Sequence, residues 1–170
     1  LLVGVTEYPE LKKSFEARGQ LAEYESRVRL KGPGNDVLRM QQTLVSVLNV
    51  APHDIAMLSA SAGPDRTPTR ANIVAGLQQL AREATANELV IVFLAGHGSQ
   101  IPDQNGDEVD GLDEVFLPAD TSVWDERTKT VTGAIVDDEF APLLAAIRAK
   151  GARVWLIVDS CHAGTMMRGG

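Results

Sequence analysis

The stretch "IVFLAGHGSQ", residues 91–100, decides the fold that we expect for this chain. The apolar residues that lead into it run without polar alternation, which is typical of a strand buried on both faces of a parallel sheet. We therefore predict a strand over residues 88–95. The apolar run then stops, and His97 follows between Gly96 and Gly98, so that a buried strand presents a single imidazole.

A second apolar strand, predicted over residues 152–159, leads through "RVWLIVDSCHAG" to Cys161. Three shorter strands are predicted over residues 1–6, 55–58 and 115–117. Apolar residues at helical spacing predict helices over residues 37–48, 73–84 and 137–149. Thr69 is expected to cap the second of these helices. Strands that alternate with helices predict an α/β fold, in which a mostly parallel sheet is sandwiched between helices.

Two segments show no such regularity. Residues 12–31 are charged and lack regular apolar spacing, so we interpret them as a surface excursion. An acidic loop that contains glycine is expected between the strand over 88–95 and the strand over 115–117. We find no repeat and no linker that would divide the chain, and its 170 residues fit one domain.

Composition and charge exclude several classes of protein. Apolar residues make up 44% of the chain and charged residues 23%, so the chain is expected to fold. The formal net charge of −7 argues against nucleic acid and anionic membrane as partners, and it favours basic substrates. The longest apolar run, residues 89–95, is too short to cross a bilayer.

Cys161 is the only cysteine of the chain, so no internal disulfide can form. A single free thiol is compatible with a reducing compartment. We therefore expect a cytoplasmic protein.

The two long strands place reactive side chains where α/β proteins bind ligands, outside the carboxyl ends of parallel strands. If the strands are neighbours, an imidazole and a thiol lie side by side. The thiol of Cys161 can then ionise and attack a carbonyl carbon, while His97 protonates the leaving amine. Glycines beside His97 allow a substrate backbone to approach closely, and the Gly98 N–H is free to point at a developing oxyanion.

Each of these residues also has a structural interpretation. A lone cysteine after a strand is usually a small buried side chain, and a histidine at a strand end is usually a solvated loop residue. The presence of both at strand ends favours a catalytic pair of His97 and Cys161. We give His53, beside a proline, and His162, which follows Cys161, structural interpretations.

Two motifs carry a resemblance to a known family. "FLAGHGSQ", residues 93–100, and "VDSCHAGT", residues 158–165, resemble the histidine and cysteine motifs of caspase-like peptidases, in particular metacaspases and orthocaspases (peptidase C14). "LKGPGNDVLRM", "NGDEVDGLDEVFLPAD" and "IVDDEF" are similar to further segments of the family, in the same order. The resemblance implies the caspase-hemoglobinase fold, a Cys161/His97 dyad, and an oxyanion hole formed by the backbone of Gly98 and Cys161.

The resemblance also implies cleavage of protein or peptide substrates after Arg or Lys. We expect that no cofactor is required. Asp36 and Asp159 match the acidic specificity positions of the family, and paired carboxylates can hold a guanidinium through charge-assisted hydrogen bonds. The structural alternative for Asp36 is that it caps a helix. For Asp159 the alternative is an ordinary turn residue at a strand end.

A calcium site is a further implication of the resemblance, because many metacaspases bind Ca²⁺ through a cluster of aspartates. Asp113, Asp137 and Asp138 match three members of that cluster, while Arg168 occupies the place of the fourth. A guanidinium removes an oxygen ligand and adds a repelling charge, so we expect weak calcium binding that activity does not require. Asp137 and Asp138 also suit a helix N-terminus.

In the family, the portion that carries the histidine and the cysteine is followed by a smaller portion. We expect residues 1–170 to be the large-subunit portion of a catalytic domain, with the chain's own small-subunit portion as its partner. Arg168 precedes two glycines, which predicts an autoprocessing site.

Two other functions stay open. Residues 103–114 imitate a calcium-binding EF-hand loop, although Glu108 stands where that loop needs glycine. A catalytically silent scaffold of caspase-like fold is the second alternative.

Overall fold

The structure is a computed structural model that describes residues 1–106 and 108–162, with the side chains of Cys161 and His162 outside the description. Within these residues a six-stranded sheet has the order β2-β1-β3-β4-β7, and β8 lies on the other side of β3. The strands are β1 (Leu2–Gly4), β2 (Met57–Ser59), β3 (Leu89–Pro102), β4 (Leu112–Phe116), β7 (Ile135–Val136) and β8 (Arg153–His162). β2, β1, β3 and β8 run parallel to one another, whereas β4 and β7 are antiparallel to their neighbours.

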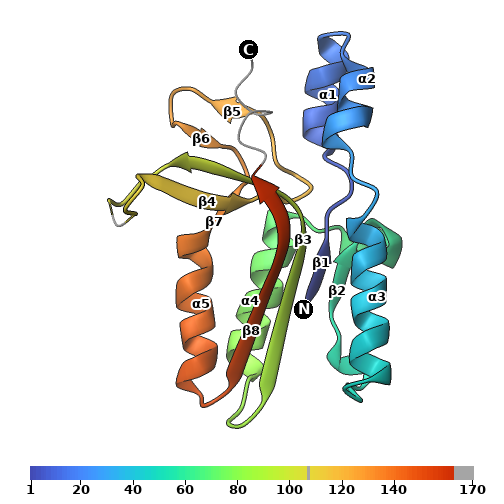
Figure 1. The fold of residues 1–170 in the computed structure, drawn as a ribbon, viewed down its shortest axis with the longest axis vertical. Coiled ribbons are helices and arrows are strands. Elements are labelled where there is room, and N and C mark those ends of the chain that lie inside the picture. Colours follow the sequence, from blue (N-terminus) through green and yellow to red (C-terminus); the bar gives the residue numbers. More distant parts are fainter. Residues whose placement is uncertain (107, 163–170) are drawn as a thin grey trace.

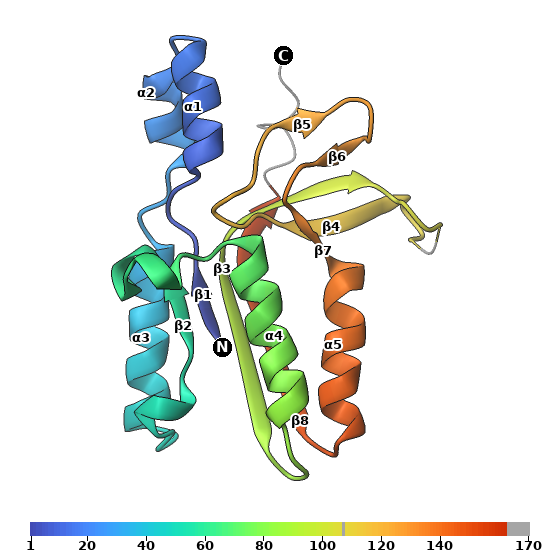
Figure 2. The same cartoon turned by 180° about the vertical axis from the view of Figure 1, so that it is seen from behind.

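Helices cover the sheet from both sides, as Figures 1 and 2 show from opposite directions. On one face, Leu2, Phe93 and Ala95 pack against Val37 and Leu44 of α3 (Pro33–Ser46). The other face carries α4 (Arg70–Glu83) and α5 (Asp137–Ala149), whose buried side chains belong to the larger core cluster. The predicted α/β fold with a mostly parallel sheet between helices is therefore confirmed.

Local signals located these helices well. α5 has the predicted bounds, and the Thr69 hydroxyl accepts a hydrogen bond from the Asn72 amide at the start of α4. The N-cap of α3 is Gly32, so that Asp36 lies within the first turn of that helix instead of capping it.

The interpretation of residues 12–31 as an irregular excursion is wrong. They fold into α1 (Pro9–Ala17), α2 (Leu21–Glu23) and a π-helical turn (Tyr24–Val28), which together stand beyond one end of the sheet (Figure 1). Four apolar or aromatic side chains hold this hairpin to the core, namely Leu11, Phe15, Tyr24 and Val28. The charged side chains between them form ion pairs on the exposed faces of the turns.

β3 also extends beyond its predicted end at residue 95. It continues to Pro102 because β4 pairs with it, in a register that runs from Gly98 opposite Phe116 to Pro102 opposite Leu112. His97 therefore lies inside a long strand and not in a loop. It marks the place where the parallel part of the sheet gives way to the antiparallel part.

Small elements complete the described residues. β5 (Trp124–Asp125) and β6 (Thr130–Val131) form a separate two-stranded sheet that the sequence patterns did not predict. Single turns of 3-10 helix lie at Pro52–Asp54, Ala60–Ala62 and Pro64–Arg66. Among the helices of the described residues, none is both long enough and apolar enough to span a bilayer.

β8 is apolar but largely uncovered. It pairs with β3 along one edge, and no strand among the described residues pairs with its other edge. Trp155 is 56% exposed and Val158 is 50% exposed, so the expectation that both faces of this strand are covered is wrong for these residues.

Candidate active site

The strands β3 and β8 bring the two predicted reactive positions together. Their parallel register runs from Leu89 opposite Arg153 to Gly98 opposite His162, and it places His97 directly opposite Cys161. Neighbouring strands lie about 4.8 Å apart, so the two backbones are in direct contact. The condition for a histidine–cysteine pair, that these strands be neighbours, is met by the backbone.

The imidazole of His97 is held in one orientation by the helical hairpin. His97 is only 4% exposed, and its Nε2 lies 2.8 Å from the Val28 carbonyl oxygen. A carbonyl can only accept a hydrogen bond, so Nε2 carries the proton and Nδ1 of the neutral ring carries the lone pair. Nδ1 is buried and has no hydrogen-bond partner among the described side chains.

Burial lowers the pKa of His97 below the ordinary value for histidine, while the hydrogen bond to Val28 acts in the opposite direction. The neutral form therefore predominates at neutral pH. A neutral imidazole with a free lone pair on Nδ1 can accept a proton from a thiol.

The backbone of His97 is held as well. Its N–H donates to the Tyr8 hydroxyl at 2.9 Å, and the Tyr8 and His97 rings lie with their centroids 5.3 Å apart. The Tyr8 N–H in turn donates to the Tyr24 hydroxyl at 3.0 Å. The sequence interpretation missed both tyrosines, and the signal that could have located them is the recurrence of aromatic residues within an otherwise charged segment.

The glycines beside His97 have different surroundings. A Cβ at Gly96 would lie 3.2 Å from both the Phe116 ring and the Val5 side chain, so this glycine also allows close packing against the core. Its proposed role in substrate approach stays a prediction. Gly98 is opposite His162 on β8, and because backbone amides alternate along a strand, its N–H is directed toward β8.

The two acidic residues proposed for specificity, Asp36 and Asp159, lie on the same face of the sheet. Asp159 pairs with Ala95, and Ala95 pairs with Gly4 of β1. Residues paired in register direct their side chains to the same face. A Cβ at Gly4 would lie 2.6 Å from the Pro33 carbonyl oxygen, so the start of α3, which carries Asp36, lies on that face.

Both of these carboxylates are accessible. Asp159 is exposed and Asp36 is partly exposed, and neither carboxylate has a hydrogen-bond or ion-pair partner among the described residues. Asp159 lies within β8 and not in a turn, because the strand continues to His162. Asp36 makes no capping hydrogen bond, although it lies in the first turn of α3, where the helix dipole favours a carboxylate.

The predicted calcium trio is distributed over different contacts. Asp113 is buried and accepts a hydrogen bond from the Gln104 amide, while Asp138 accepts one from the Asn105 side chain. Asp137 instead lies with Glu108 and Glu114, with one oxygen of each within 4.8 Å of the others. Burial raises the pKa of Asp137 above its ordinary value, and the nearby Asp138 and Glu114 carboxylates act in the same direction.

The segment 103–114 does not form an EF-hand. It connects the antiparallel strands β3 and β4, and no helix flanks it. The Asp103 carboxylate accepts hydrogen bonds from three amides of its own loop, those of Asn105, Gly106 and Glu108. Asp103 therefore stabilises a turn.

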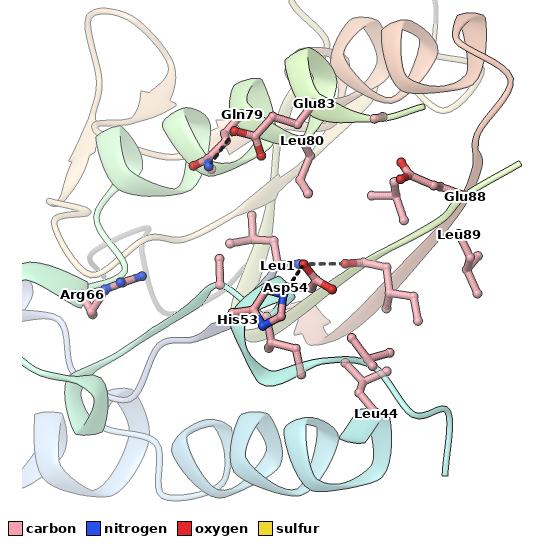
Figure 3. A pocket seen from close by; sticks show the side chains of 17 residues that line it. Leu1, Leu44, His53, Asp54, Arg66, Gln79, Leu80, Glu83, Glu88 and Leu89 are labelled. Carbon is pink, nitrogen blue, oxygen red and sulfur yellow. Dashed lines mark hydrogen bonds and ion pairs between the residues drawn. The ribbon is translucent and has the colours of Figure 1, made fainter. Parts of the chain in front are cut away.

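A cavity of about 660 Å³ lies at the opposite end of the sheet, against the first residues of β3 (Figure 3). Leu1, Leu80 and Leu89 line it together with charged side chains such as Glu83 and Glu88. His53 lies at its margin beside Asp54, in agreement with its structural interpretation. The cavity starts at Ile91, six residues before His97, so it lies roughly 20 Å from the dyad along an extended strand.

The predicted autoprocessing residue Arg168 lies outside the described residues.

Comparisons with known proteins agree with this arrangement. The family described as "Metacaspase, peptidase C14 domain" matches residues 20–169. Metacaspase-1 of Cryptococcus neoformans is 37% identical over 139 residues, which cover 81% of this chain and 29% of that protein. Metacaspase-1 of Arabidopsis thaliana is 35% identical over 143 residues, which cover 84% of this chain and 37% of that protein. The chain thus spans about a third of the length of these relatives.

A solved structure is similar in fold. The crystal structure of protein GSU0716 from Geobacter sulfurreducens matches with a TM-score of 0.64 and 25% identity, covering 96% of this chain and 50% of that one. The family match over most of the sequence carries the assignment, and the similar structure supports its fold. The chain therefore belongs to the metacaspase family of the C14 peptidases.

Proposed function

We propose that this chain is the histidine- and cysteine-bearing portion of a cysteine endopeptidase that cleaves after Arg or Lys. The observation that carries the proposal is the register of β3 and β8, which sets His97 opposite Cys161. The orientation of the imidazole supports it, because the hydrogen bond to Val28 leaves Nδ1 as the basic atom.

In the proposed reaction, His97 Nδ1 takes the proton of the Cys161 thiol, and the thiolate attacks the scissile carbonyl carbon. The Gly98 and Cys161 amides donate to the oxyanion that forms, which on this proposal requires that they leave the ladder between β3 and β8 at its end. His97 then returns the proton to the leaving amine, and the amine departs from an acyl-enzyme thioester. Water attacks the thioester, its proton passes to His97, and the thiol is restored as the acid product leaves.

Specificity for Arg or Lys is proposed to come from Asp36 and Asp159. Asp159 ends the row Gly4–Ala95–Asp159, and Asp36 lies in α3, whose first turn covers Gly4 on the same face. Both carboxylates are accessible. A guanidinium bound between them would replace water with charge-assisted hydrogen bonds. The net charge of −7 also favours basic substrates and disfavours nucleic acid and anionic membranes as partners.

We propose no required cofactor, and weak calcium binding that activity does not need. Of the predicted ligands, Asp113 and Asp138 each accept a hydrogen bond from the acidic loop, while Asp113 Oδ1 and Asp137 Oδ1 are buried without a hydrogen-bond partner among the described residues. Calcium commonly takes 6–8 oxygen ligands, so the three carboxylates of Glu108, Glu114 and Asp137 would need several further oxygens from water or the backbone.

The proposed partner, besides substrates, is the chain's own small-subunit portion, which would pair with the open edge of β8. Exposed apolar side chains such as Trp155 and Ile157 support an occupant of this kind, since an apolar strand edge is otherwise prone to aggregation. The cytoplasm remains the proposed location, and Arg168 the proposed autoprocessing site.

The experiment is cleavage by the full-length protein of fluorogenic peptides that end in Arg, Lys or Asp. Turnover of the Arg and Lys peptides alone would support the proposal. Turnover of the Asp peptide alone would refute the assigned pocket. Absence of turnover with all three would favour the silent scaffold of caspase-like fold, whose only support is that the described residues leave β8 uncovered.

A further inference from the structure

We infer that Tyr8 and Tyr24 are positioning residues for the catalytic imidazole, and that their hydroxyls form a relay that locks His97 to the helical hairpin. The inference rests on the proposed function of His97. It concerns two residues that do not touch the substrate and act only through the histidine.

The need for such a lock comes from the construction of the sheet. The Val5 amide donates to the Ala95 carbonyl, and the Leu117 amide donates to the His97 carbonyl. Along this edge of β3, pairing with β1 thus ends at Ala95, and pairing with β4 begins at His97. In a strand the N–H and the carbonyl of one residue point to the same side, so the His97 N–H faces the junction between the two strands.

The Tyr8 hydroxyl fills this junction. It accepts from the His97 N–H at 2.9 Å, where a continuous strand would have supplied a carbonyl oxygen. Tyr8 is 0% exposed, so water cannot replace the hydroxyl without a rearrangement of the core. A buried amide without a partner costs about 1–3 kcal/mol, so the bond defines where the backbone of His97 lies.

Tyr24 holds Tyr8 in turn. Its hydroxyl accepts from the Tyr8 N–H at 3.0 Å, and its ring packs against Phe15 with centroids 6.2 Å apart. Tyr24 also begins the π-helical turn that ends at Val28, whose carbonyl accepts from the imidazole. The backbone of His97 is therefore held by Tyr8, which immediately precedes α1, and its ring by the π-helical turn. The Tyr24 hydroxyl, which accepts from the Tyr8 N–H, connects these two contacts.

Burial alone would explain two core tyrosines, but it would not explain the direction of their hydroxyls. Phenylalanine would fill the same volume without a polar atom to satisfy. Here each hydroxyl accepts from a backbone amide, and the two bonds lead from the hairpin to the residue that carries the base. π-helical turns are also frequent at functional sites.

The test uses the full-length protein with Tyr8→Phe and Tyr24→Phe, each of which removes one oxygen atom. Leu11→Ala is the matched control, because it removes buried apolar atoms from the same hairpin and leaves both hydroxyls and the contact between the Phe15 and Tyr24 rings in place. Active sites are counted with a peptidyl-arginine chloromethyl ketone, so that turnover is expressed per competent site. Melting temperatures are recorded for all variants.

We expect kcat per titrated site to fall roughly tenfold to a hundredfold in Tyr8→Phe, with KM nearly unchanged, because a small displacement of a catalytic group costs rate and not binding. Tyr24→Phe should show a smaller loss in the same direction. Leu11→Ala should lower the melting temperature and keep the wild-type kcat per site. Wild-type kcat per site in Tyr8→Phe, or an equal loss in Leu11→Ala, would overturn the inference.

A second readout is independent of proteolysis. Nitrogen chemical shifts of His97 report its tautomer. We expect the Nε2-protonated form in the wild type and a mixture of tautomers in Tyr8→Phe, because the released backbone of His97 shifts the ring relative to the Val28 carbonyl that fixes the tautomer. An unchanged tautomer in both tyrosine variants would overturn the inference even in an active enzyme. A wild type that cleaves none of the peptides would overturn the proposed function alone, since the tautomer is measured without substrate.

Discussion

Replacing Gly96 by alanine should destabilise the protein through its packing, although the residue is next to His97. The added Cβ would lie 3.2 Å from the Phe116 ring and 3.2 Å from the Val5 side chain. Carbon atoms prefer separations of about 3.5–4.0 Å, so one of these neighbours must move. Overpacking of this kind costs about 1–3 kcal/mol.

The expected change is readily measured. For a protein of this size, 1 kcal/mol corresponds to about 2–4 °C in melting temperature, so Gly96→Ala should melt about 2–12 °C below the wild type. Calorimetry or urea titration would measure the loss. Phe116→Leu alone removes ring atoms from a buried position and should also destabilise.

The double variant identifies the cause. If the clash with Phe116 is responsible, Gly96→Ala should cost less in the Phe116→Leu background than in the wild type. If Gly96 served substrate approach instead, alanine would raise KM and leave stability unchanged. Unchanged stability in the single variant, or strict additivity in the double variant, would refute the packing argument.

Other predictions concern the chemistry. Cys161→Ala and His97→Ala should each abolish cleavage in an activity assay, and Cys161→Ala should leave the melting temperature nearly unchanged. Measurable turnover by pure Cys161→Ala protein would refute the mechanism. Asp159→Ala should lower kcat/KM for an Arg peptide by at least about tenfold, because a charge-assisted hydrogen bond is lost, and Asp36→Ala should act in the same direction. Because burial lowers the pKa of His97 in the folded protein, stability should decrease as pH falls below the value of unfolded histidine, about 6.5; urea titrations at several pH values should show a weaker decrease in a His97→Asn variant. Activity should persist in excess EGTA, and its loss there with recovery in millimolar CaCl₂ would show that calcium is required.

The parts of the fold that sequence patterns predicted well are those determined locally. α5 begins where acidic residues suit a helix N-terminus, and α4 begins at a threonine that accepts from an amide two residues into the helix. The capping groups and the apolar periodicity lie within a few residues of each other. The bounds of these helices could therefore be derived without knowledge of the tertiary structure.

The errors arise where contacts between residues that are distant in sequence determine the structure. β3 continues past Ala95 because β4 supplies hydrogen-bond partners, and the glycines of this segment gave no sign of a strand. The hairpin over residues 9–28 is held by a few buried side chains among many charged ones, so its average composition resembled that of a loop. The positions of His97 and Cys161 were predicted, but the groups that orient His97 lie in that hairpin and were missed.

The two halves of the proposed dyad differ in how the described residues support them. His97 is buried, its ring and its backbone are hydrogen-bonded, and both contacts come from elements within this chain. β8, which carries Cys161, is held along one edge only, and its apolar side chains from Trp155 to Val158 are exposed. The base is therefore set in place by this segment of the protein. On the proposed function, the alignment of the nucleophile depends in addition on whatever covers β8, so that occupation of this strand edge could control activity without moving the histidine.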